Sequence, residues 1–162
     1  MSPENIGFSD KPVHVTPEGL EKLQTEVEKL RTGMRSEIRE RLKRAMEFGD
    51  LSENAEYNDA KNDQAWCESR IQALEKTIRS AVLIDLKARK GSKVTLGSKV
   101  KVKDEYGESR YTIVGSVEAN PAKGMISEES PVGKALMGHS KGDVVEAKTP
   151  GGIVKMSILI VS

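Results

Sequence analysis

Two rows of apolar residues with heptad spacing constrain the fold of this chain more than any other feature of its sequence. The first row has steps of three and four residues and consists of Leu20, Leu23, Val27, Leu30 and Met34. Such steps place apolar side chains on one stripe of an α-helix and are typical of a coiled-coil seam. Beyond Met34 the row continues through Ile38 and Leu42 in steps of four, which departs locally from strict heptads.

Start and stop signals bound this first helix. Thr16 is a candidate N-cap, and Pro17 suits the first helical position, where its missing amide donor costs nothing. Gly49 follows the last periodic residues, and glycine readily adopts the left-handed backbone conformation that ends a helix. The sequence therefore predicts one helix over about residues 16–48.

A second row of the same kind begins a few residues later. Its members again alternate steps of three and four: Tyr57, Ala60, Gln64, Cys67, Ile71, Leu74, Ile78 and Ala81. Two long amphipathic helices joined by so short a link must fold back on each other, with a tip near residues 48–53. Cys67 lies on the seam, so we interpret it as a small buried hydrophobic residue and not as a nucleophile.

The second half of the chain changes to the alternation typical of β-strands. Val100 and Val102 alternate with lysines, and the segments 143–148 and 153–161 flank a turn at 149–152. A Ser-Pro pair at residue 130 can begin a short helix over 132–137.

These patterns predict an α+β protein of two domains. Residues 1–87 form an N-terminal antiparallel coiled-coil hairpin, and residues 88–162 form a small domain of antiparallel strands with one short helix.

The charges nearly cancel but are unevenly distributed. The chain has 26 Lys and Arg against 25 Asp and Glu, which argues against a generic polyanion-binding protein. Residues 31–44 nevertheless hold six basic and two acidic residues, whereas residues 47–63 hold six acidic and one basic. Composition alone favours two solvated helix faces of complementary charge.

Nothing in the sequence indicates secretion or a membrane. No run of about 18 apolar residues is present, and the first residues lack the basic and apolar regions of a signal peptide. The single cysteine cannot form an internal disulfide. We therefore expect a cytoplasmic protein.

Asp50 and Glu53 stand out because they are three residues apart where one helix ends and the next begins. One interpretation is structural: Asp50 as N-cap and Glu53 at the third helical position would resemble a capping box. The other is chemical, because two carboxylates that point off the end of a hairpin could hold Mg²⁺ weakly and leave most of its ligand shell open. The two interpretations are compatible, and the sequence leaves both open.

Four segments together carry a resemblance to a known family. They are Thr-Pro-Glu-Gly-Leu-Glu-Lys-Leu at 16–23, Gly-Asp-Leu-Ser-Glu-Asn-Ala-Glu-Tyr at 49–57, Ser-Pro at 130–131 and Thr-Pro-Gly-Gly at 149–152. In this order they closely resemble the bacterial Gre transcript-cleavage factors, nearest to the GreA branch, over all but about a dozen N-terminal residues. The resemblance implies an FKBP-like topology for the C-terminal domain.

The resemblance also implies a partner and a mechanism. The C-terminal domain would dock at the rim of the secondary channel of bacterial RNA polymerase, and the hairpin tip would pass through that channel. There Asp50 and Glu53 would help to hold a Mg²⁺ shared with the polymerase and would promote cleavage of the nascent RNA 3′ segment in backtracked complexes. The chain alone would be a monomer, would bind no metal stably and would hydrolyse nothing.

Residues for RNA contact and docking follow from the same resemblance. Arg41, Arg44 and Lys61 would contact the phosphates of the extruded RNA, although a solvated helix face is an equally good interpretation of each. Ser130 and Pro131 would belong to a loop that docks on the polymerase. For the Ser130 hydroxyl itself, we favour a helix N-cap.

Other functional classes receive less support. A paralogue could occupy the channel and inhibit the polymerase without cleavage; the acid pair argues against it, whereas Met46 and Phe48, which depart from the family pattern, leave room for it. Prolyl isomerase activity is excluded because only Tyr106 and Tyr111 beyond residue 90 could line a proline pocket. A nucleic-acid-binding module would need more basic and stacking surface.

Overall fold

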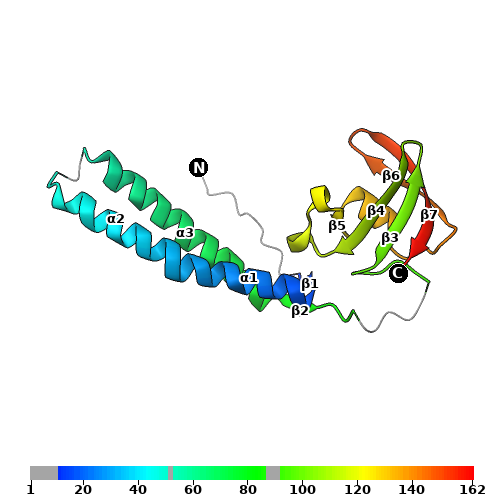
Figure 1. Ribbon diagram of the computed structural model, residues 1–162, viewed down its shortest axis with the longest axis horizontal. Helices are drawn as coiled ribbons and strands as arrows, with labels where there is room; N and C mark the ends of the chain where they lie inside the picture. The colour runs from blue at the N-terminus through cyan, green and yellow to red at the C-terminus, as the bar shows by residue number, and fades with distance from the viewer. Residues whose placement is uncertain (1–10, 51–52, 87–91) are drawn as a thin grey trace. The chain divides into compact units, whose positions relative to one another are not determined.

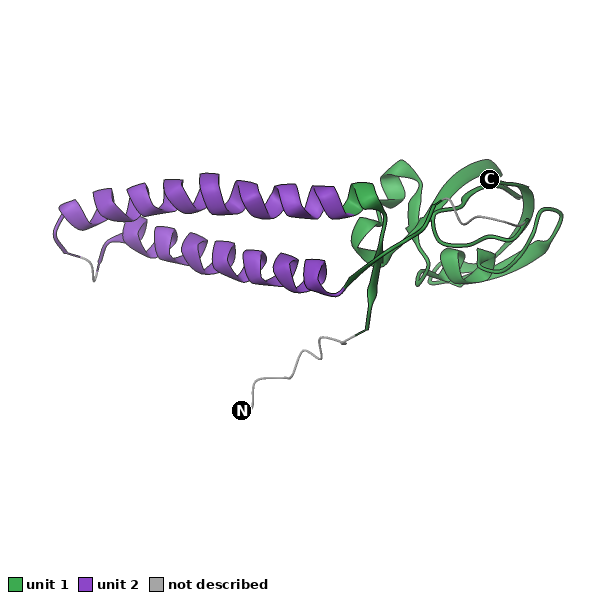
Figure 2. Cartoon of the chain, turned by 90° about the horizontal axis from the view of Figure 1, so that it is seen from below, with its two compact units in different colours: residues 1–19, 81–162 green, residues 20–80 purple. Residues whose placement is uncertain are grey.

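A computed structural model describes residues 11–50, 53–86 and 92–162. Backbone contacts divide the chain into two compact units, drawn in different colours in Figure 2. One unit consists of residues 20–80, here called the hairpin unit. The other, here called the sheet unit, consists of residues 1–19 together with 81–162.

The hairpin unit confirms the two predicted helical arms, which lie side by side in Figure 1. Its elements are α1 (Pro17–Lys29), of which residues 17–19 belong to the sheet unit, the π-helical turn η1 (Leu30–Met34), α2 (Arg35–Glu47) and α3 (Ala55–Arg79). The predicted seams form its core, in which the buried residues are Val27, Ile38, Leu42, Ala60, Cys67, Ile71 and Leu74. Burial raises the pKa of the Cys67 thiol, so this cysteine is a poor nucleophile, as expected.

The π-helical turn explains why the first seam departs from heptads. A π turn contains more residues than an α turn, and here the Arg35 amide donates to the Leu30 carbonyl five residues back. The wider turn accommodates the steps of four residues from Leu30 to Met34 and on to Ile38. All three side chains consequently stay on the seam.

Ion pairs join the two arms on either side of the seam. Arg35 donates twice to Glu68, at 2.8 and 2.7 Å, and Arg41 lies 2.5 Å from Asp63. Further pairs join Arg31 to Glu75 and Arg70 to Glu26. The segregated charges are thus in part the complementary helix faces that composition favours. Each exposed pair contributes little energy, but together they help to fix the alignment of the arms.

In the sheet unit, a short parallel pair is formed by the segments that precede and follow the two arms in the sequence. It consists of β1 (Val13–Val15) and β2 (Ala81–Leu83), which the sequence did not predict because three residues are too few to show alternation. The start of α1 is as predicted, because the Gly19 amide donates to Thr16 Oγ1 at 3.0 Å. The Thr16 amide and hydroxyl in turn donate to the carboxylate of Glu118.

The remaining strands form a curled five-stranded sheet with the order β5-β4-β3-β7-β6, visible in Figure 1. Their bounds, with those of the short helices, are β3 (Lys99–Asp104), β4 (Gly107–Val114), η2 (Ser116–Glu118), η3 (Pro121–Lys123), β5 (Met125–Ser127), α4 (Pro131–Leu136), β6 (Val144–Thr149) and β7 (Gly152–Val161). The core of this unit includes Ile113, Leu136 and Ile158.

The predicted α+β class is confirmed, with one correction to the strand directions. The β3–β4 and β6–β7 hairpins are antiparallel as expected, but β5 is parallel to β4. The reason is the connection: η2 and η3 carry the chain back along the sheet, so β5 starts again in the direction of β4. The sheet is therefore mostly antiparallel.

No helix in the described ranges is both long enough and apolar enough to cross a membrane.

Candidate functional site

The first arm ends as the sequence predicts. Helix α2 stops at Glu47, and the amides of Phe48 and Gly49 close its last turn by donating to the carbonyls of Ala45 and Met46, each at 3.3 Å. Gly49 has a φ of +92°, in the left-handed region that favours glycine. Of the predicted tip near 48–53, residues 51 and 52 lie outside the described residues.

The second arm begins at a residue that sequence reasoning missed. Asn54 is the N-cap of α3: its Oδ1 accepts a hydrogen bond from the Tyr57 amide at 3.1 Å. Its Nδ2 donates to the carbonyl of Ala45 on the first arm at 2.9 Å. One side chain therefore caps α3 and also ties the two arms together. Asparagine caps as well as aspartate does, so the available signal was Asn54, three residues before the first residue of the second seam.

This geometry overturns the capping-box interpretation of the acid pair. Helix α3 starts at Ala55, so Asp50 lies four residues before the N-cap, and Glu53 precedes the cap instead of following it. Both carboxylates belong to the short link between α2 and α3, and both residues are exposed. Their place in the sequence is therefore not explained by helix capping.

The link offers two oxygen ligands of the kind that magnesium prefers. Mg²⁺ prefers hard oxygen ligands, and proteins usually hold it through one or two carboxylates plus substrate phosphates and water. Asp50 and Glu53 supply two exposed carboxylates within four residues. Among the described residues no group of three or more His, Cys, Asp or Glu side chains is placed to hold a metal ion.

The three predicted RNA-contact residues differ in their surroundings. Arg41 is half-buried and paired with Asp63 across the arms. Lys61 is exposed; its Nζ lies 3.2 Å from Gln64 Oε1 and 5.8 Å from the centre of the Tyr57 ring. Arg44 is exposed in the last turn of α2. The structure thus gives Arg41 a structural partner and leaves the cations of Arg44 and Lys61 at the surface.

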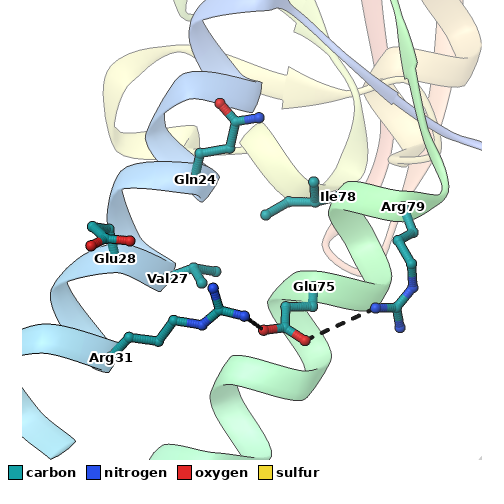
Figure 3. A pocket seen from close by; sticks show the side chains of 7 residues that line it. All are labelled: Gln24, Val27, Glu28, Arg31, Glu75, Ile78 and Arg79. Atoms are coloured by element: carbon teal, nitrogen blue, oxygen red, sulfur yellow. Dashed lines mark hydrogen bonds and ion pairs between the residues drawn. The ribbon is translucent and has the colours of Figure 1, made fainter.

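The hairpin unit also has a hollow away from the link, shown in Figure 3. It has a volume of about 440 Å³ and lies between α1 and α3, with Val27 and Ile78 among its apolar lining. Glu75 lies between Arg31 and Arg79, with the Arg79 guanidinium 4.0 Å away. None of the predicted site residues lines this hollow.

At the predicted docking loop, Ser130 acts as the helix cap that we favoured. Its Oγ accepts from the Gly133 amide at 3.0 Å and donates to the Ser127 carbonyl at 2.7 Å. Pro131 occupies the first turn of α4 and lines an open surface hollow together with Lys134 and Glu146. The hydroxyl therefore has a local structural role.

Comparison with known proteins agrees with this architecture. The family profile described as "Transcription elongation factor, N-terminal" matches residues 13–83, and that described as "Transcription elongation factor, GreA/GreB, C-term" matches residues 89–162. A helical hairpin with an acidic link, followed by a curled sheet, is thus the architecture of a transcription elongation factor. The chain belongs to the GreA/GreB family.

Individual relatives are similar over nearly their whole length. "Transcription elongation factor GreA" of Thermoanaerobacter pseudethanolicus is 52% identical, over 92% of this chain and 96% of that protein. The protein of the same name from Clostridioides difficile is also 52% identical, over 93% and 96%. Among solved structures, GreA factor homolog 1 (Gfh1) of Thermus thermophilus is 30% identical with a TM-score of 0.44, covering 94% of this chain and 99% of that one.

Proposed function

We propose that this transcription elongation factor binds bacterial RNA polymerase and stimulates cleavage of the RNA 3′ segment in backtracked complexes, so that elongation resumes. The observation that carries the proposal is the acidic link. Asp50 and Glu53 are exposed between the two arms, and Asn54, not the acid pair, caps the second arm. We expect the protein to act in the cytoplasm, where bacterial RNA polymerase works.

The hairpin supplies a rigid support for the two carboxylates. Asn54 bridges the Tyr57 amide of one arm and the Ala45 carbonyl of the other, so the ends of the link are held together. A narrow hairpin that ends in a held link suits entry into the secondary channel of the polymerase. A firm support matters because catalysis requires groups to be positioned within a fraction of an ångström.

The carboxylates would act within the polymerase active centre. Asp50 and Glu53 would hold a second Mg²⁺ together with the polymerase, and such an ion would stabilise the attacking and leaving oxygens of phosphodiester hydrolysis. Each carboxylate can also accept a hydrogen bond from the attacking water and so orient it. The chain would therefore supply side chains to the hydrolysis carried out by the polymerase and would not form a complete active site alone.

Basic residues near the link would guide the RNA. Arg44 and Lys61 are exposed cations on the two arms, suited to contact phosphate oxygens. We also propose an RNA contact for Arg41, which would have to exchange its ion pair with Asp63 for a phosphate. That exchange makes its expected contribution smaller than that of Arg44 or Lys61.

The sheet unit would dock at the rim of the secondary channel through the segment that contains Ser130 and Pro131. Since the Ser130 hydroxyl is occupied by the cap, we expect it to shape the loop and the exposed Pro131 to provide contact surface. The identity of about 50% to proteins named GreA over nearly their whole length favours the cleavage factor over an inhibitory paralogue.

A cleavage assay with a stalled, backtracked polymerase complex tests this function. Addition of the wild-type chain with Mg²⁺ is expected to release a short RNA 3′ fragment and to restore elongation when nucleotides are supplied. Arrest of the complex without release of a fragment would contradict the proposal and would indicate an inhibitor.

A further inference from the structure

A cavity in the sheet unit is lined by basic residues to which the proposed function assigns no role. It has a volume of about 430 Å³ and is formed by β3, β4, β7 and the turn at η3. Cavities of about 300–1,000 Å³ are typical of sites for small molecules. Four of its lining residues are cations: Lys99, Lys101, Arg110 and Lys123.

The strand register brings three of these cations to one face of the sheet. Lys99 and Lys101 are two residues apart on β3 and therefore share a face. Lys101 is opposite Arg110 on β4 and opposite Ile160 on β7. Like charges directly opposite each other destabilise a sheet. The pairing of Lys101 with Arg110 is therefore not explained by the stability of the fold.

The fourth cation is placed by a close backbone approach. Gly124 follows Lys123 with a φ of +70°, and its carbonyl accepts from the Thr112 amide on β4 at 2.8 Å. A Cβ atom at residue 124 would lie only 2.8 Å from the Arg110 carbonyl oxygen. Glycine thus lets the η3 turn lie against β4, and this sets Lys123 beside the cavity that Arg110 lines.

The positive charge at the cavity is only partly balanced. Glu108 forms an exposed ion pair with Lys101, with 2.5 Å between Oε2 and Nζ. The pKa of Glu108 lies below its ordinary value, first because of the hydrogen bond from Lys101, then because of the charges of Lys101, Lys103 and Arg110. No ion pair joins Arg110 or Lys123 to another residue in the part of the chain that the structure describes.

We propose that this cavity binds a small molecule that carries a polyphosphate chain, such as a nucleoside di- or triphosphate. Phosphate oxygens accept strong charge-assisted hydrogen bonds from Arg and Lys, and a polyphosphate concentrates several charges within one cavity. The charges of an RNA backbone or an acidic peptide are instead spread along a chain. Ile160, which is 49% exposed, lines the same cavity and offers an apolar wall to the organic part of the ligand.

Calorimetric titration of the full-length chain tests the proposal with three probes: inorganic tripolyphosphate, ATP and a single-stranded RNA oligonucleotide. Saturable binding of one tripolyphosphate or one ATP per chain is expected. Tighter binding of ATP would identify a nucleotide as the ligand type, whereas equal affinity would identify the phosphate chain as the group recognised. Absence of saturable binding of both, or tighter binding of the RNA than of either, would overturn the proposal.

Matched variants separate a site from general attraction between opposite charges. The double variant Lys101→Gln/Arg110→Gln is expected to bind tripolyphosphate at least about tenfold more weakly, because it removes two charged donors. The control Lys141→Gln/Lys155→Gln removes the same charge from exposed residues outside the cavity and also breaks an exposed ion pair, that of Lys155 with Glu146. The affinity of this control variant for tripolyphosphate should change by less than about twofold. An equal loss in both variants would overturn the proposal.

Discussion

In the hairpin unit, single rows of side chains from two arms form the core, whereas in the sheet unit five strands and α4 surround a common interior. The depth of burial differs accordingly. Of the largest fully buried side chains in the described ranges, Cys67 alone belongs to residues 20–80, whereas Ile113, Leu136 and Ile158 are examples from the sheet unit. The hairpin compensates with ion pairs across its seam, such as Arg35 with Glu68.

This difference suits the different roles proposed for the two units. A seam one side chain wide gives a narrow, long element that can carry a few functional groups at its end. A sheet with a deep core gives a surface with fixed register, which suits docking and the binding of ligands.

Truncation of a buried side chain should destabilise the sheet unit more than the hairpin unit. Ile113→Ala in the sheet unit should lower the free energy of unfolding by about 3–5 kcal/mol, and Ile71→Ala in the hairpin by about 2–3 kcal/mol, since a seam open to solvent collapses more easily around a cavity. Trp66 is the single tryptophan and lies on α3, so its fluorescence follows the hairpin unit during urea unfolding.

The urea midpoint of the Trp66 transition should be lower in Ile71→Ala than in the wild type and nearly unchanged in Ile113→Ala. Amide signals of the sheet unit, followed by NMR, should show the reverse. Equal shifts of the Trp66 transition in both variants would contradict the division into two separately stabilised cores.

Removal of the Asn54 side chain, which caps α3 and bridges the arms, should reduce stability by an intermediate amount. Asn54→Ala loses both the acceptor for the Tyr57 amide and the donor to the Ala45 carbonyl, and should destabilise the hairpin by about 1–2 kcal/mol. Asn54→Asp keeps the acceptor and loses only the donor, so its loss should be smaller. Urea unfolding followed through Trp66 measures both, and equal losses would show that the bridge to Ala45 contributes nothing.

The ion pair across the seam should give the smallest effect, visible as a pH dependence. The pKa of Glu68 is lowered, first by its hydrogen bond from Arg35. A lowered pKa in the folded state means that the stabilisation is present above the pKa of the unfolded chain, about 4.5 here, and is lost as the pH falls through the folded value. When the pH is lowered from neutral to about 3, the urea concentration at the midpoint of the Trp66 transition should therefore fall more in the wild type than in Glu68→Gln.

Much of this molecule follows from local sequence patterns. The two seams predict the arms because long periodic rows leave few alternatives, and the Ser130–Pro131 pair predicts the start of α4 because its signal lies within two residues. The turn that begins at Asp104 is also local, because this side chain accepts from the amides of Tyr106 and Gly107.

The features that the sequence does not predict depend on distant or competing partners. The β1–β2 pair joins segments more than sixty residues apart, and the parallel strand β5 depends on two short helical turns. At the link, Asp50 competes with Asn54 as a possible cap. The choice falls on Asn54 because its amide accepts from Tyr57 and also donates to Ala45, whereas an ionised carboxylate can only accept.

We propose that the link has two functions carried by different residues: Asn54 holds the arms together, and Asp50 with Glu53 takes part in the chemistry. The most direct test is the rate of RNA cleavage in a backtracked polymerase complex with Asp50→Asn/Glu53→Gln. This variant keeps the size of both side chains and leaves the cap untouched. We expect unchanged unfolding and polymerase binding, loss of most cleavage, and partial recovery at raised Mg²⁺ or Mn²⁺. Near-normal cleavage by this double variant would contradict the chemical role of Asp50 and Glu53.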